Sequence, residues 1–493
     1  MSNALSSSGF YKLGLMSESW VCRLQEEVPV LVTNWSGRQG FYSTMNEDDS
    51  AFKQKVQARL SAMMEDWLTE HFPTHRLLLA SLVVKFPQGD QIVGLHRDWA
   101  YVDETKYNSL NFWIPLEDVD ELRGCIHIVP GSHRSASPFR GTPFVSMPKY
   151  LEENIMQGAE ALPMTKGEVL VYDSRLLHFS NPCSGKKPRI AVAGVIIPSE
   201  AQPIHYSFNE GQCVTYDARG DFFSTFTPGK TIAARILSTE NDIAKVSHYY
   251  DRVNHEYMQH YGEHIQAFRP TEDALLFNHM VESMKLSEGL QVVDAGCGVG
   301  GSMRALAERV KAHFKGFTLS TVQVEEGRLK NQKHSAKECL EIDYGDYHHL
   351  DQLVARQSVD RVLFIESLGH STQLHHAVQS AEAILKPGGI LYIKDFFPFY
   401  RKDEDLCRQQ EEVIERINQY YAYNVIDFEH LMQCLRKEGL RILTIQAFPF
   451  EDDITKRFAF EEALDIDLFE GKPEFRVAEW LEIVVQKPIN PMY

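Results

Sequence analysis

The sequence predicts two domains of different fold class, an antiparallel β-sandwich or jelly roll followed by an α/β domain with a parallel sheet. Its 493 residues exceed what one hydrophobic core usually organises. Before about residue 235, short apolar runs alternate with turns that contain glycine and proline, a pattern typical of antiparallel β-proteins. After it, apolar runs alternate with helical stretches, which indicates β–α–β units.

The strands expected in the two parts are short and apolar. Turns such as "PGSH" and "TKGE" separate those of the first part, which we expect over 78–86, 109–116, 125–132, 167–173 and 189–197. Those of the second part are expected over 290–298, 314–320, 359–366 and 388–396. We place the domains at 1–240 and 241–493, with segment 200–245 an ordered extension at the junction rather than a loose linker.

Composition narrows the class of protein. The net charge of −18 argues against a nucleic-acid surface, which needs a basic patch. Apolar runs stay short of the roughly 18–20 residues that span a bilayer, and the first residues lack the features of a secretory signal. Eight scattered cysteines with no C-x-x-C pair indicate reduced thiols. We expect a cytoplasmic protein that acts on a small molecule, without nucleic-acid or membrane partners; its oligomeric state is not predicted.

The stretch "GLHRDWAYVDE" places His96 and Asp98 two positions apart. At the end of a strand such side chains project to the same side, so the pair is either a charged surface turn or part of a metal site. A non-haem iron centre needs one more imidazole, and His178 follows the apolar run of "VLVYDSRLLHFSNP". On its own, His178 would equally suit a hydrogen-bonded core histidine. Arg189, at the start of another apolar run, offers a guanidinium able to hold a carboxylate.

Residues of about 75–200 resemble the phytanoyl-CoA dioxygenase family of Fe(II)/2-oxoglutarate oxygenases. The chain has H-x-D, "PGSH", H-x-S and an arginine in the order of that family. The resemblance implies a double-stranded β-helix (jelly roll) with flanking helices, and Fe(II) bound by His96, Asp98 and His178. It also implies that Ser180 and Arg189 hold the far carboxylate of 2-oxoglutarate, with O₂ as the oxidising co-substrate. Because Asp98 is present, hydroxylation is favoured over the halogenation of relatives that lack this carboxylate.

The second candidate site is "LQVVDAGCGVGGSMRALAERV", an apolar strand, a glycine-rich turn and an amphipathic helix. Gly296, Gly298 and Gly300 let the backbone approach a ligand closely. Dinucleotide folds use a related glycine pattern for a pyrophosphate, so the glycines alone decide little. Asp294 precedes them, however, where a carboxylate can meet the α-amino group of a methionine-derived ligand, and no phosphate-binding basic residue follows.

Residues 245–493 are strongly similar to class I S-adenosylmethionine-dependent methyltransferases, which have an α/β Rossmann-like fold. The subgroup with sterol, tocopherol and geranyl diphosphate methyltransferases shares "DAGCGVGG", the strand end "TLS-x-x-Q" and an E-x-x-x-H segment. The resemblance implies that the methionyl half of S-adenosyl-L-methionine contacts Asp294, Gly296 and Gly298. It implies ribose and adenosine contacts from Thr318, Leu319, Ser320 and Gln323, and adenine contacts from Asp346 and Tyr347.

Three further features have both a functional and a plain structural interpretation. Tyr250, in "SHYYDRVNHEYMQHYG", either closes over the cofactor or packs a lid helix. Glu366 and His370, after the fourth strand, are candidates for general base or cation stabiliser, or else a helix cap and a surface residue. The helical insertion 404–435 is expected to cover the pocket, and its tyrosines to belong to the core or to an acceptor site.

The sequence therefore predicts a bifunctional tailoring enzyme that hydroxylates and methylates one small-molecule scaffold, most simply in that order. One alternative is a protein or peptide hydroxylase–methyltransferase, which an acidic surface would suit. Another is a fusion in which one domain serves only as a binding or regulatory module. The substrate, the oxidised carbon and the methyl-accepting atom are not predicted.

Overall fold

The computed structural model describes residues 2–31, 39–87, 93–145, 147–184, 186–209, 212–226, 233–239, 241–471 and 476–489. The chain divides into two compact units, Met1–Asn241 and Asp242–Tyr493, and each is described by itself. Among the described residues, no helix has the length and apolar character needed to cross a membrane.

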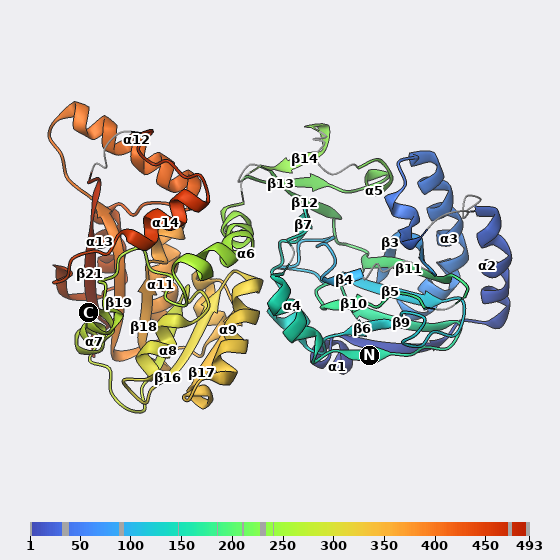
Figure 1. The fold of residues 1–493 in the computed structure, drawn as a ribbon, viewed down its shortest axis with the longest axis horizontal. Coiled ribbons are helices and arrows are strands. Elements are labelled where there is room, and N and C mark those ends of the chain that lie inside the picture. Colours follow the sequence, from blue (N-terminus) through green and yellow to red (C-terminus); the bar gives the residue numbers. More distant parts are fainter. Residues whose placement is uncertain are drawn as a thin grey trace. The chain divides into compact units, whose positions relative to one another are not determined.

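The first unit is built on three sheets (Figure 1). The largest has six antiparallel strands in the order β1-β9-β5-β11-β3-β2: β1 (Phe10–Leu15), β9 (Glu168–Asp173), β5 (Leu110–Pro115), β11 (Arg189–Pro198), β3 (His75–Phe86) and β2 (Gly40–Ser43). A second antiparallel sheet has the order β4-β10-β6-β8: β4 (Val93–His96), β10 (His178–Ser180), β6 (Ile126–Ile128) and β8 (Glu160–Leu162). The third has the order β14-β13-β12-β7: β14 (Ile236–Ser238), β13 (Gln212–Asp217), β12 (Ile204–Asn209) and β7 (Gly141–Thr142).

Helices flank these sheets. They are α1 (Ser2–Ser7), α2 (Glu18–Leu31), α3 (Ser50–His71), α4 (Lys149–Met156) and α5 (Phe222–Thr225). The alternation of side chains along β5 shows how the six-stranded sheet is covered. Phe112 and Ile114 pack with the apolar faces of α2 and α3, whereas Trp113 between them packs with residues of β6. The six-stranded sheet is therefore buried on both faces, by helices on one side and by the second sheet on the other.

The second unit is a seven-stranded sheet between helices, in the order β17-β16-β15-β18-β19-β21-β20 (Figure 1). Its strands are β15 (Gln291–Ala295), β16 (His313–Thr318), β17 (Leu340–Tyr344), β18 (Val359–Ile365), β19 (Leu385–Pro398), β20 (Arg441–Ala447) and β21 (Ala478–Gln486). The first five are parallel, and β21 runs antiparallel to both β19 and β20. The strand order reverses between β15 and β18, where open α/β sheets bind ligands beyond the carboxyl ends of their strands.

Helices cover both faces of this sheet. They are α6 (Asp242–His260), α7 (Asp273–Ser283), α8 (Gly301–Ala307), α9 (Thr321–Lys333), α10 (Leu350–Leu353), α11 (Leu374–Ile384), α12 (Glu404–Tyr420), α13 (Phe428–Lys437) and α14 (Thr455–Ala463). On one face, Val293 and Phe364 pack with residues of α11 and α13. On the other, Val292 and Leu363 pack with α7 and α8. Neighbouring residues of one strand therefore pack into the hydrophobic cores on opposite faces of the sheet.

Gly301, the first residue of α8, allows the chain around Glu263 to pass close to the helix. A Cβ at Gly301 would lie 1.9 Å from the Glu263 carbonyl oxygen, which is backbone and cannot simply move aside. We expect Gly301→Ala to lower the free energy of unfolding of the second unit by about 1–3 kcal/mol, a usual cost of overpacking. Urea denaturation followed by circular dichroism measures it, with Gly158→Ala as control because only ordinary contact awaits a Cβ there. Equal stability of Gly301→Ala and wild type would contradict this packing.

Candidate functional sites

The candidate metal ligands of the first unit are brought together by strand pairing. Strand β10 lies antiparallel beside β4 with His178 directly opposite His96, and their ring centroids are 4.2 Å apart. Asp98 follows β4, and its Oδ2 lies 3.7 Å from Nε2 of His178. One ligand atom from each of the three residues lies within 4.8 Å of the other two.

Hydrogen bonds orient each of these side chains. Nδ1 of His96 lies 2.8 Å from the Gly94 carbonyl oxygen, and Nδ1 of His178 lies 3.0 Å from that of Leu176. A carbonyl accepts only, so in each ring Nδ1 carries the hydrogen and Nε2 keeps its lone pair. Asn111 Nδ2 donates to Asp98 Oδ2. Two imidazole nitrogens and one carboxylate oxygen, each held by a further partner, are a donor set that fits Fe(II).

Arg189 and Lys85 form a buried pair of cations close to this centre. They lie opposite each other on β11 and β3, and are 2 % and 1 % exposed. Arg189 donates from Nη1 to the Gly124 carbonyl at 2.7 Å, its guanidinium lies 5.1 Å from the Trp113 ring centroid, and its Nε is buried without a partner. Lys85 donates from Nζ to the Ser180 carbonyl at 2.5 Å. Burial and the neighbouring Arg189 lower the pKa of Lys85 to about 7.

Neither cation pairs with a carboxylate among the described residues. Isolated buried charge is costly, so the arrangement suits an anion from outside the chain. Ser180 and Arg189 were predicted at this site from the sequence, whereas Lys85 was not. The only indication of Lys85 in the sequence is its place within the apolar run 78–86, because charged residues are rare in buried strands.

The glycine-rich turn of the second unit follows β15. Gly296 and Gly298 have φ of 93° and 55°, a left-handed region that favours glycine. A Cβ at Gly296 would lie 2.4 Å from Cβ of Ser367, so a side chain there would also collide. The backbone is thus held close to Ser367 at the carboxyl ends of β15 and β18.

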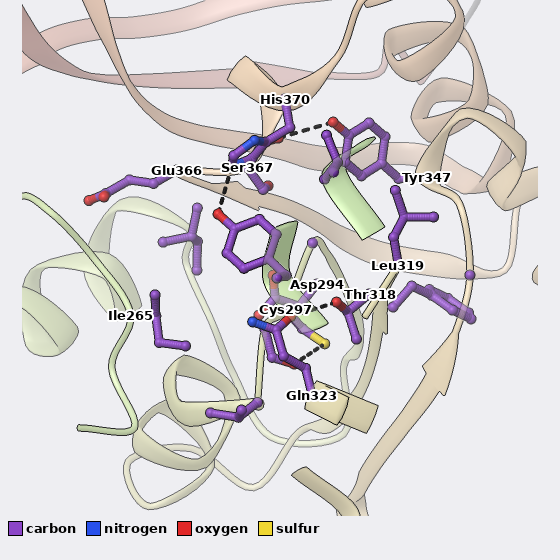
Figure 2. A pocket seen from close by; sticks show the side chains of 18 of the residues that line it. Ile265, Asp294, Cys297, Thr318, Leu319, Gln323, Tyr347, Glu366, Ser367 and His370 are labelled. Carbon is purple, nitrogen blue, oxygen red and sulfur yellow. Dashed lines mark hydrogen bonds between the residues drawn. The ribbon is translucent and has the colours of Figure 1, made fainter. Parts of the chain in front are cut away.

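Asp294 lies at the carboxyl end of β15 and lines the pocket shown in Figure 2. The residue is 1 % exposed, and neither carboxylate oxygen has a hydrogen-bond partner in the part of the chain that the structure describes. Burial raises the pKa of Asp294 to about 7. An ammonium group of a ligand would supply the missing counter-charge.

Most of the predicted S-adenosylmethionine residues line this pocket. They are Tyr250, Asp294, Gly296, Gly298, Thr318, Leu319, Gln323 and Tyr347. Gln323 Oε1 accepts a hydrogen bond from the Thr318 hydroxyl at 2.8 Å, and its buried Nε2 has no partner among the described residues. Residues not foreseen also line it: Asp242, Ile243, Val246, Ile265, Cys297, Ser367 and His348.

Ser320 and Asp346 are not among the residues that line the pocket, and their side chains form hydrogen bonds within the protein. Ser320 caps α9 by accepting from the Gln323 amide, and its hydroxyl donates to Asp251 at 2.6 Å. Asp346 accepts from the His348 amide and lies 2.6 Å from Nδ1 of His348. Burial alone would raise the pKa of Asp346, but the bonds with His348 outweigh it and hold that pKa below its usual value. The side chains of Ser320 and Asp346 are therefore both engaged in hydrogen bonds with other residues of the protein.

A larger cavity of about 710 Å³ adjoins the pocket. Four residues line both spaces: Tyr250, Ile265, Glu366 and His370. The cavity wall is rich in aromatic rings, from Tyr257, Tyr261, Phe268, Phe396, Tyr421, Tyr423, Phe450, Phe469 and Trp480. Of the tyrosines in the helical insertion, Tyr421 and Tyr423 face this cavity, whereas Tyr420 is 37 % exposed. Tyr421 also packs against the core cluster that contains Phe460, so it belongs both to the core and to the cavity wall.

Glu366 lies in the left-handed region, with φ of 53°, directly after β18. Its carboxylate accepts from the amides of Ala267 at 2.5 Å and Phe268 at 3.2 Å, and pairs with the fully buried Lys394. Burial raises the pKa of Glu366 despite Lys394. The side chain therefore ties down segment 267–268 and does not cap the following helix.

His370 is bonded through both ring nitrogens and is not a surface residue. Nδ1 lies 2.9 Å from the Ala422 carbonyl oxygen, and Nε2 lies 2.7 Å from the Tyr250 hydroxyl. Burial lowers the pKa of His370 to about 4, so the imidazole is neutral at physiological pH. Tyr250 thus bonds to a candidate catalytic residue as well as lining the cofactor pocket.

The buried Asp294 makes stability depend on pH. Its folded pKa of about 7 exceeds the ordinary 3.8, so the folded state holds a proton that the unfolded state has lost. Without cofactor, we expect the free energy of unfolding of the second unit to fall as pH rises from 4 to 7 or above, by on the order of 4 kcal/mol. Asp395, whose pKa burial also raises to about 7, contributes a fall of its own, so the variant Asp294→Asn should show a fall smaller by the contribution of Asp294, as measured by urea denaturation across that range. Identical pH profiles of the two proteins would contradict the assignment.

Comparison with known proteins gives two family matches. Residues 36–191 match the phytanoyl-CoA dioxygenase family, and residues 286–445 match a methyltransferase domain. Curated relatives resemble the second region. A 24-methylenesterol C-methyltransferase of Arabidopsis thaliana is 27% identical over 160 residues, 32% of this chain and 44% of the relative. Methyltransferase GfsG of Streptomyces halstedii is 33% identical over 116 residues, 24% and 41% of the two chains.

The chain spans about half the length of the curated relatives it matches. Among solved structures, geranyl diphosphate C-methyltransferase from Streptomyces coelicolor, with Mg²⁺, geranyl-S-thiolodiphosphate and S-adenosyl-L-homocysteine, is 18% identical with a TM-score of 0.35. That match covers 44% of this chain and 76% of the other. One family match lies in each of the two units of the chain. The chain joins a domain of the phytanoyl-CoA dioxygenase family to a methyltransferase domain, and both belong to enzyme families.

Proposed function

We propose that the protein is a bifunctional tailoring enzyme that hydroxylates and methylates a small molecule, using Fe(II), 2-oxoglutarate, O₂ and S-adenosyl-L-methionine. One observation carries the proposal: each unit buries ionisable groups that the described chain leaves without a partner of opposite charge, and the charged form of each is opposite in sign to the proposed ligand. Arg189 and Lys85 are cations that suit a dicarboxylate, and Asp294 is an acid that suits an ammonium group. We also propose that the sheets of the first unit form a double-stranded β-helix and that the second unit is Rossmann-like, with domains 1–240 and 241–493.

In the first unit, His96, Asp98 and His178 would hold the iron, and Arg189 with Ser180 would hold the far carboxylate of 2-oxoglutarate. Lys85 adds positive charge to that end and fixes the backbone after His178 through the Ser180 carbonyl. With its co-substrates bound, such a centre supplies an oxidant for an unactivated C–H bond. The protein residues hold the ligands and determine which C–H bond lies near the metal.

In the second unit, Asp294 would bind the α-amino group of the cofactor, and Gly296 and Gly298 would let the backbone approach its methionyl half. Methyl transfer is an in-line displacement, so positioning provides much of the acceleration. The adjoining cavity supports a small-molecule acceptor, because an aromatic-lined space of about 710 Å³ lies within the usual range for such ligands. This favours a small molecule over a peptide as substrate. Each unit also has the residues proposed above to hold its metal or cofactor, which argues against a unit that serves only as a binding or regulatory module.

Exchange of the proposed metal ligands tests the first site. We expect His178→Ala and Asp98→Ala to weaken Fe(II) binding by more than the roughly 10–100-fold that loss of an outer partner costs. Anaerobic calorimetry measures the affinity, and His75→Ala, at the start of β3, is the histidine control. Binding of S-adenosyl-L-homocysteine should stay unchanged in both variants, whereas Asp294→Ala should weaken it and leave Fe(II) binding intact. A single substitution that abolished binding of both Fe(II) and S-adenosyl-L-homocysteine in a folded protein would contradict the model of two independent sites.

The order of reactions is tested with methyl-labelled S-adenosyl-L-methionine and a small-molecule extract of the source cells. We propose that hydroxylation comes first, because it would create a methyl acceptor. We therefore expect a labelled product with one extra oxygen, detected by mass spectrometry only when Fe(II) and 2-oxoglutarate are added. Equal label without 2-oxoglutarate would show that methylation is first or independent.

A further inference from the structure

The methyl group must cross the boundary between cofactor pocket and acceptor cavity. Only Tyr250, Ile265, Glu366 and His370, among the residues described, line both spaces. Ile265 is an aliphatic side chain, so the chemistry of the boundary depends on the other three. The assignment of the two spaces rests on the proposed function.

Glu366 is poorly placed to act as base or to stabilise a cation. Its charge is balanced by Lys394, which also donates to the Gln266 side chain at 2.7 Å and the Phe268 carbonyl at 2.8 Å. Its two oxygens already accept three hydrogen bonds, from Lys394 and two backbone amides. The boundary therefore offers no uncompensated carboxylate, among the described residues, to a carbocation formed by methylation of carbon.

Tyr250 and His370 are, in contrast, arranged to move a proton. The Ala422 carbonyl fixes the hydrogen of His370 on Nδ1, so Nε2 is the acceptor and the Tyr250 hydroxyl is the donor. The Tyr250 hydroxyl also interacts with the Tyr257 side chain, and its oxygen has a second lone pair able to accept a proton from the acceptor hydroxyl. His370 is neutral when the relay begins, as a general base must be.

We propose that the methyl acceptor is a hydroxyl group and that Tyr250 relays its proton to Nε2 of His370. An oxygen lone pair of the acceptor forms the new O–C bond, and the C–S bond breaks with its electrons staying on sulfur. The acceptor proton passes to the Tyr250 oxygen while the Tyr250 proton passes to His370. One positive charge leaves the sulfonium as one appears on the imidazolium, so the net charge of the closed site does not change. Glu366 is then a positioning residue that holds the 267–268 wall.

The relay is tested with two probe acceptors, phenol and 4-nitrophenol, at mildly alkaline pH. Phenol is protonated there and needs a base, whereas 4-nitrophenol is already ionised and does not. We expect Tyr250→Phe and His370→Gln to lower kcat/KM for phenol by about 10²–10⁴-fold, the usual contribution of a general base, and to leave transfer to 4-nitrophenolate nearly unchanged. Tyr400→Phe is the control, an exposed tyrosine that lines neither space.

Calorimetry with S-adenosyl-L-homocysteine separates failure of the relay from failure of the proposed function. Wild type that does not bind it overturns the methyltransferase assignment. Wild type that binds it but methylates neither phenol overturns the hydroxyl acceptor. Equal losses on both phenols in the two variants would mean that Tyr250 and His370 shape the site without moving a proton.

Discussion

Both candidate sites depend on burying ionisable groups for which the described chain supplies no partner of opposite charge. Placing an ionic group away from water costs several kcal/mol unless a partner compensates. Asp294 in one unit and the pair of Arg189 and Lys85 in the other meet that cost without a partner of opposite charge among the described residues. Rigid strands hold all three: Asp294 ends a central parallel strand, and the two cations face each other on neighbouring antiparallel strands. Each sheet thus keeps a polar position within an otherwise apolar layer.

The candidate metal centre depends on one register between two short strands. His178 lies opposite His96 because β10 pairs with β4 at that residue. A shift of one residue would turn His178 to the other face of its sheet, away from Asp98. The pairing of β10 with β6 on its other side fixes the same register through three consecutive residues. Lys85 adds a side-chain constraint by holding the carbonyl of Ser180.

The parts of the candidate sites that lie within a few residues of one another could be predicted from the sequence, whereas contacts between distant segments could not. The spacing of His96 and Asp98, and the run from Asp294 to Gly298, express strand period and turn geometry within a few residues. Lys85 could not be identified because its meeting with Arg189 follows from strand order, which no local pattern contains. Ser320 and Asp346 were predicted from their positions in family motifs. In the structure their side chains form hydrogen bonds with Asp251 and His348. The partners of Glu366, the amides of Ala267 and Phe268, lie about a hundred residues away in the chain.

The wall that α6 gives to the cofactor pocket has a consequence for dissecting the protein. Asp242, Ile243, Val246 and Tyr250 line the pocket, yet the methyltransferase match begins only at residue 286. A fragment cut at that match would keep the glycine-rich turn and the sheet, and would lack one side of the binding site and the hydroxyl that bonds His370. The smallest fragment that keeps this wall therefore starts at Asp242, the first residue of α6, which is also the first residue of the second unit.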